Sequence, residues 1–120
     1  MLKQKYRLKK KYQFNYVYRV GKSCHGKFLM LVYSPSKNQN IKIGISVSKK
    51  VGNSVKRNRA RRLLREAISP FINDLNPNFN LIIVAKQSID GVKLNAVYND
   101  LKSLLDKTEL TNKWKRFLNS

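Results

Sequence analysis

The sequence predicts one mixed domain of helices and strands, an α+β or α/β sandwich with helices covering part of one sheet. Two observations favour this class: short apolar or alternating segments of strand length, and longer segments with apolar residues at helical spacing. Their order is helix, two strands, helix, strand, helix. The chain has 120 residues, the length of one domain, so residues 1–120 are assigned to a single domain.

The first helix is predicted over residues 12–21, YQFNYVYRVG. Phe14, Val17 and Tyr18 stand at i, i+3 and i+4, which places them on one face of a helix. Gly21 is a suitable residue to end it. The segment is therefore a short amphipathic helix.

Two strands are predicted next. Residues 27–34, KFLMLVYS, form a continuous apolar run closed by Pro35, which indicates a buried strand. Residues 41–48, IKIGISVS, alternate strictly between apolar and polar or small residues, so one face lies in the core and the other is open. The open face consists of Lys42, Gly44, Ser46 and Ser48.

The second helix follows the turn VGN at 51–53, with Asn53 or Ser54 as N-cap and Pro70 ending it near Ser69. Its apolar residues fall within an arc of about 100° on a helical wheel; they are Ala60, Leu63, Leu64, Ala67 and Phe71. Basic and amide side chains fill most of the remaining circumference. This helix therefore packs one stripe on the sheet and presents the rest to solvent or a ligand.

The last elements are a buried strand over 80–86, NLIIVAK, and an amphipathic helix over 94–107. A terminal helical turn over 111–118 would pack Trp114 and Phe117. The strand–helix–strand unit from 41 to 86 would by default cross over in the right-handed sense.

The net charge of the chain indicates what kind of molecule it binds. The chain carries 26 Lys and Arg against 6 Asp and Glu, a formal net charge of +20. Such a balance favours a polyanion, nucleic acid before an anionic membrane. No apolar run approaches the roughly 20 residues that span a bilayer, and no secretory signal is visible. With a single Cys24, the chain fits a reducing compartment, and we expect a cytoplasmic protein.

The sequence offers no catalytic centre of its own. Among the acidic residues only Asp106 and Glu109 lie close together, so no carboxylate cluster for Mg²⁺ is visible. Cys24 and His25 are adjacent, which is not a metal-ligand spacing, and a lone histidine makes no acid–base couple. Whether the chain helps to bind a metal stays open.

Two surfaces for RNA are expected. The arginine-rich helix, with Lys49 and Lys50 before it, would contact phosphates, because the guanidinium fork matches their geometry. The first helix and the open strand face would form a groove in which bases stack on Phe14 and Tyr18. Lys42, Ser46 and Ser48 would line its floor. The alternative for the two rings is an ordinary place in the core.

Residues 44–67, GISVSKKVGNSVKRNRARRLLREA, resemble the signature of the bacterial ribonuclease P protein subunit. The flanking segments agree, so the similarity covers nearly the whole chain. The resemblance implies an αβββαβα sandwich with helices packed on a central four-stranded sheet. It also implies a left-handed βαβ crossover, against the right-handed default, and a short first strand in SCHG at 23–26.

The resemblance implies the function as well: the protein component of an endoribonuclease whose chemistry is carried by a catalytic RNA. That RNA, which would hold the Mg²⁺ cofactor, removes the 5′ leader from precursor tRNA, and we expect a 1:1 protein–RNA complex. The residues expected to bind the catalytic RNA are Lys49, Lys50, Lys56, Arg57, Asn58, Arg59, Arg61, Arg62 and Arg65. Those expected to bind the leader are Phe14, Tyr18, Tyr33, Lys42, Ser46 and Ser48, with Leu31 a rival to Tyr33 on the same strand face.

Three other classes of protein share some of these features. A ribosomal protein would be equally small and basic. A self-sufficient nuclease would need a cluster of catalytic side chains that the sequence does not contain. A membrane-surface protein would need a lipid-facing aromatic stripe opposite its basic residues, whereas the arginine-rich helix has a small Ala/Leu stripe suited to packing on a sheet.

Overall fold

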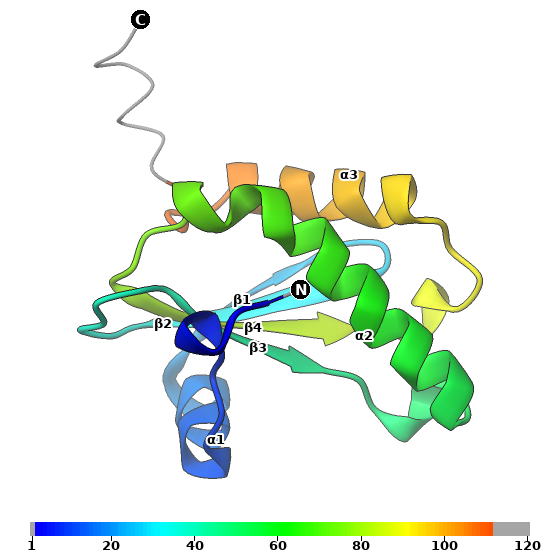
Figure 1. Ribbon diagram of the computed structural model, residues 1–120, viewed down its shortest axis with the longest axis horizontal. Helices are drawn as coiled ribbons and strands as arrows, with labels where there is room; N and C mark the ends of the chain where they lie inside the picture. The colour runs from blue at the N-terminus through cyan, green and yellow to red at the C-terminus, as the bar shows by residue number, and fades with distance from the viewer. Residues whose placement is uncertain (1, 112–120) are drawn as a thin grey trace, which may run out of the picture.

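The computed structural model describes residues 2–111, and these form a four-stranded sheet with helices on both faces (Figure 1). The main elements are α1 (Lys11–Val20), β1 (Lys22–His25), β2 (Leu29–Pro35), β3 (Lys42–Ser46), α2 (Ser54–Ile68), β4 (Phe79–Ala85) and α3 (Leu94–Asp106). Helices α2 and α3 cover one face, and α1 lies against the other. The predicted αβββαβα order is confirmed, including β1. The predicted terminal turn with Trp114 and Phe117 lies outside the described residues.

The sheet has the strand order β1-β2-β4-β3. β2 pairs antiparallel with β1 and β4, whereas β3 and β4 are parallel and joined through α2. This β3–α2–β4 crossover is left-handed (Figure 1), so the right-handed default is wrong and the sense implied by the family resemblance is confirmed. Two short 3₁₀ segments, Lys49–Val51 and Ser69–Asp74, lie in the connections on either side of α2.

Both faces of the sheet are buried at its centre. The larger core lies between the sheet and helices α2 and α3, where Leu31, Leu81 and Ile83 meet helical leucines such as Leu64 and Leu101. A smaller core lies under α1 and contains Leu8, Val17, Val32 and Ile82. Burial on two sides explains why β2 and β4 read as continuous apolar runs rather than alternating ones.

Helix α2 forms as its sequence predicts. The Asn53 side chain accepts a hydrogen bond of 3.1 Å from the Lys56 N–H and so caps the first turn. The helix ends at Ile68, and the chain continues as 3₁₀ turns through Pro70. Its buried residues are Ala60, Leu64, Ala67 and Ile68. Phe71, predicted on the same stripe, lies beyond the helix and stacks on Tyr98 of α3 at 5.1 Å.

The Asp100 side chain of α3 is hydrogen-bonded to the turn between β1 and β2. The Asp100 carboxylate accepts hydrogen bonds from the backbone N–H groups of Lys27 at 3.0 Å and Phe28 at 2.8 Å. Its oxygens lie close to Gly26, where a Cβ atom would be 2.6 Å away. Glycine at this position therefore allows the close approach.

We expect Asp100→Ala to lower the free energy of unfolding by about 2 kcal/mol, because two backbone donors lose a charged acceptor. Urea denaturation measures the change. Asp106→Ala is the matched control, since Asp106 is exposed at the end of the same helix. Equal stability of the two variants would contradict the bridging role of Asp100.

Candidate nucleic-acid interface

The residues predicted to bind the catalytic RNA lie on α2 and on the 3₁₀ turn before it, and all of them are exposed or partly exposed. We call this set the arginine surface: Lys49, Lys50, Lys56, Arg57, Asn58, Arg59, Arg61, Arg62 and Arg65. Lys49 and Lys50 lie in the 3₁₀ turn Lys49–Val51, not at the end of a strand. This turn ends shortly before α2 begins at Ser54, so basic residues continue from one element to the other.

Several side chains of the arginine surface are held in place by polar contacts. Arg59 Nη2 donates to the Val92 carbonyl at 3.1 Å, and Arg61 Nη1 donates to Asn58 Oδ1 at 2.8 Å. Lys56 Nζ lies 3.1 Å from Asp90 Oδ2. This is one of two ion pairs found within residues 2–111, the other being Lys22–Glu109. Most of the positive charge is therefore not neutralised by carboxylates of the described chain.

A hollow of about 360 Å³ opens on this surface. Its lining residues are Asn58, Arg61, Arg62, Arg65 and Glu66. Three guanidinium groups around one hollow, with amide donors beside them, suit an anionic group such as a phosphate. The Glu66 carboxylate, which also lines the hollow, does not balance the charge of the three guanidinium groups.

On the opposite face, Phe14 of α1 packs directly over Gly44 of β3. A Cβ atom at position 44 would come within 2.4 Å of the Phe14 ring, so only glycine leaves room for it. Phe14 is partly buried beside Val17, whereas Tyr18, one turn later, is 44% exposed. The Phe14 ring therefore contacts the core and is also partly exposed.

The predicted floor of the groove is only partly as expected. Ser46 ends β3 and is partly exposed, and Lys42 Nζ donates to the Lys5 carbonyl at 2.7 Å. Ser48 does not lie on the strand, because β3 ends two residues earlier. Its hydroxyl instead accepts from the Lys50 N–H and caps the 3₁₀ turn. The prediction that Ser48 lines the strand face is therefore wrong.

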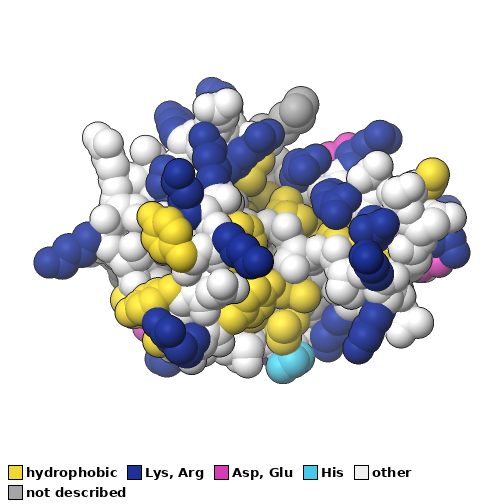
Figure 2. Space-filling view, turned by 90° about the horizontal axis from the view of Figure 1, so that it is seen from below, with side chains coloured by type: hydrophobic (Ala, Val, Ile, Leu, Met, Phe, Trp, Pro, Cys, Tyr) yellow, Lys and Arg dark blue, Asp and Glu magenta, His cyan; other side chains and the backbone are white. Residues whose placement is uncertain are grey.

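Two residues of this face were missed from sequence. Met30 and Val84 are partly exposed and pack against the small core under α1. With Phe14, Tyr18 and Ser46 they form what we call the sheet surface. Figure 2 views the molecule from this side and shows hydrophobic side chains gathered near the middle, with Lys and Arg around them. The only signal in the sequence was their place in buried runs, which does not distinguish the two faces.

Tyr33 was predicted to line the same groove, and this prediction is wrong. Tyr33 and its rival Leu31 both point into the larger core, on the face covered by α2 and α3. The Tyr33 ring contacts Phe79 edge to face at 5.9 Å. Because side chains alternate along a strand, the residues of β2 beside α1 are Met30 and Val32 instead.

Burial raises the pKa of the Tyr33 hydroxyl above its ordinary value of 10.0; Glu109 adds to this shift and Lys22 opposes it. The unfolded chain then loses this proton at lower pH than the folded chain, so the free energy of unfolding should fall as the pH rises above about 10. Tyr33→Phe should remove that part of the alkaline loss. Urea denaturation of both proteins at several alkaline pH values measures it, and parallel pH profiles would contradict the prediction.

The two predicted surfaces meet at Arg65. This residue lines the hollow on α2 and also a smaller cavity of about 170 Å³. Phe14, Gly44, Arg7 and Lys9 border the smaller cavity as well. The structure therefore brings the arginine surface and the aromatic end of the sheet surface together along one edge of the sheet.

Within residues 2–111, no three side chains of His, Cys, Asp or Glu gather closely enough to hold a metal ion. In the same part of the chain, none of the helices has the length and apolar character needed to cross a bilayer.

Comparison with known proteins gives a consistent result. A family model described as Ribonuclease P matches residues 2–109. Ribonuclease P protein components of Clostridioides difficile and Clostridium kluyveri are 34% and 39% identical to this chain; the matches cover 87% and 88% of it and 92% and 96% of the relatives. A solved ribonuclease P protein of Staphylococcus aureus has a TM-score of 0.80 at 28% identity, covering 89% of this chain and 98% of its own. That of Thermotoga maritima, 21% identical with a TM-score of 0.77, shares the fold; the match covers 86% and 97%.

Proposed function

This chain belongs to the ribonuclease P protein family, and from that premise we propose how its two surfaces serve the holoenzyme. Its family makes it the protein subunit of an endoribonuclease that processes tRNA, in partnership with ribonuclease P RNA and a tRNA substrate. The proposal concerns the division of labour: the polypeptide binds and positions RNA, and the RNA subunit carries out the cleavage.

The arginine surface binds the catalytic RNA in this proposal. The observation that carries it is the hollow ringed by Arg61, Arg62 and Arg65, whose guanidinium groups have no matching set of carboxylates. Contacts of this kind go to phosphates, so they set the position of the protein on a folded RNA without reading its sequence. Arg62 is exposed, whereas Arg61 and Arg65 are partly buried.

The sheet surface holds the 5′ leader of precursor tRNA. Phe14 and Tyr18 supply aromatic faces for unpaired bases, and Met30 and Val84 supply an apolar floor. Because stacking is tolerant of base identity, the leader sequence should matter little. Tyr33 has no part in this surface.

The Mg²⁺ required for cleavage is held mainly by the RNA subunit in this proposal. One protein chain binds one catalytic RNA, and the complex works in the cytoplasm.

Reconstitution tests the proposal. At low Mg²⁺, mixing this chain with a bacterial ribonuclease P RNA should speed removal of the leader from precursor tRNA relative to the RNA alone. The chain without RNA should cut nothing. Polylysine at equal charge is the control for non-specific neutralisation. Cleavage by the chain alone, or equal stimulation by polylysine, would refute the proposed division of labour.

A further inference from the structure

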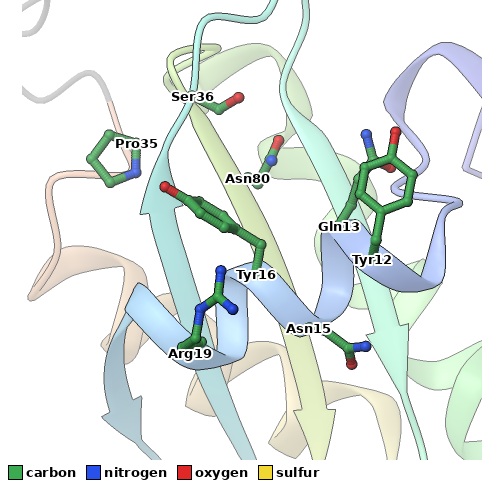
Figure 3. A pocket seen from close by; sticks show the side chains of 8 residues that line it. All are labelled: Tyr12, Gln13, Asn15, Tyr16, Arg19, Pro35, Ser36 and Asn80. Atoms are coloured by element: carbon green, nitrogen blue, oxygen red, sulfur yellow. The ribbon is translucent and has the colours of Figure 1, made fainter.

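The outer flank of α1 bears a second aromatic pocket, of about 450 Å³, that neither surface includes (Figure 3). It lies between α1 and the point where β2 ends and β4 begins. Val17 points into the small core and marks the middle of the buried side of α1. At 100° per residue, Tyr12 and Tyr16 fall on one flank of that line, and Phe14 and Tyr18 fall on the other. The body of α1 therefore separates this pocket from the sheet surface.

The two tyrosine rings of this pocket are available to a ligand. Tyr12 is 69% exposed and Tyr16 is 49% exposed. The ring pairs found among the described residues, Tyr33–Phe79 and Phe71–Tyr98, include neither of them. The Arg19 guanidinium lies 5.6 Å from the centre of the Tyr16 ring, and Figure 3 shows Ser36 and Asn80 on the other side of that ring.

The sheet side of the pocket presents polar atoms of both kinds. Asn80 Oδ1 accepts from Asn38 Nδ2 at 2.8 Å, which leaves the Asn80 amide N–H groups as donors. The Ser36 hydroxyl donates to Asn38 Oδ1 at 3.2 Å, which leaves its lone pairs as acceptors. Donor and acceptor groups beside an exposed aromatic ring are the combination that holds an unpaired base by its face and its edge.

Charge indicates that the ligand is anionic. Arg19 lines the pocket, and no carboxylate lines it. Neither ion pair found in residues 2–111 involves Arg19. A planar aromatic group that carries negative charge fits these features, and a nucleotide has both parts.

We propose that this pocket binds a single unpaired nucleotide of the ribonuclease P RNA, with its base against Tyr16 and its phosphate near Arg19. The inference rests on the proposed function, since it presumes that the chain binds this RNA. The leader is assigned to the other flank of α1, so a strand lying there does not occupy this pocket. A pocket bounded by one helix and by the ends of two strands suits one extruded base of a folded RNA better than a run of extended strand.

Tyr16→Ala tests the proposal. Its affinity for ribonuclease P RNA should fall about tenfold, because one base loses its stacking partner. Tyr16→Phe should retain most of the affinity, since it keeps the ring. The preference for precursor over mature tRNA should be unchanged in both variants. Thermal denaturation checks that the half-exposed position tolerates the change, and Tyr12→Ala, at a still more exposed position, provides a second variant.

Three outcomes would overturn the inference. The affinity for the RNA subunit could stay unchanged in both alanine variants; Tyr16→Phe could lose as much affinity as Tyr16→Ala; or the variants could lose only leader preference, which would assign the pocket to the substrate. Failure of the proposed function looks different, because the unmodified chain would then bind ribonuclease P RNA no better than an unrelated RNA of equal length.

Discussion

Raising monovalent salt from 50 to 200 mM should weaken binding of this chain to ribonuclease P RNA by about 10³-fold, if about six phosphates are neutralised. The physical reason is counterion release: each Lys or Arg that contacts a phosphate frees a condensed cation, and added salt opposes that gain. The arginine surface offers enough cations for six contacts, even though Arg59 and Arg61 each donate one hydrogen bond within the protein. Filter binding or fluorescence anisotropy across the salt series gives the slope.

Substitution of single basic residues should show which of them contribute to this salt dependence. Arg62→Gln should reduce the steepness of the log–log plot by about one and weaken binding to RNA of any sequence alike. Lys102→Gln removes the same charge from an exposed position on α3, outside the arginine surface, and should leave the slope nearly unchanged. A flat salt response of the unmodified chain, or equal effects of the two variants, would remove the electrostatic explanation.

Replacing Phe14 should cost the complex about tenfold in its preference for precursor tRNA over mature tRNA, the effect of losing one stacked base. Phe14→Leu is the informative variant. Leucine keeps apolar contact with the small core around Val17 but offers no aromatic face. The measurement is the ratio of dissociation constants of the holoenzyme for the two RNAs, with thermal denaturation to report folding.

Two controls accompany this variant. Tyr16→Ala, on the opposite flank of α1, should leave the precursor preference intact. Gly44→Ala should lower the preference for precursor tRNA although it replaces no aromatic residue. A Cβ atom at position 44 would lie 2.4 Å from the Phe14 ring and must displace that ring. If Phe14→Leu weakens binding of precursor and mature tRNA equally, the ring serves the core alone and the leader assignment fails.

The sequence predicted the elements well where local pattern determines structure. Helix α2, its Asn53 cap and its end near Ser69 follow from capping chemistry, the apolar stripe and Pro70. Strands β2 and β4 follow from apolar runs of strand length, and each boundary differs by no more than two residues. These features are local, because each depends on residues a few positions apart.

Predictions of which sheet face a side chain occupies failed where the local sequence pattern does not distinguish the two faces. Tyr33 lies in a run that is buried on both sides, so alternation could not indicate which face its ring occupies. Ser48 continued the alternation of the preceding strand, yet its hydroxyl forms a better local contact as the cap of the next turn. In both cases the deciding interaction lay outside the periodic pattern.

Taken by itself, the order of residues determined the helices, the strands, the arginine surface and, through a long specific motif, the family. Tertiary structure alone decided that Phe14 packs over Gly44, that Arg65 joins two surfaces, and that the flank of α1 with Tyr12 and Tyr16 meets the end of β2 and the start of β4. The reason is physical. Periodicity records which side of an element is buried, but only the packing of distant strands and helices determines what that side, and the side opposite, will meet.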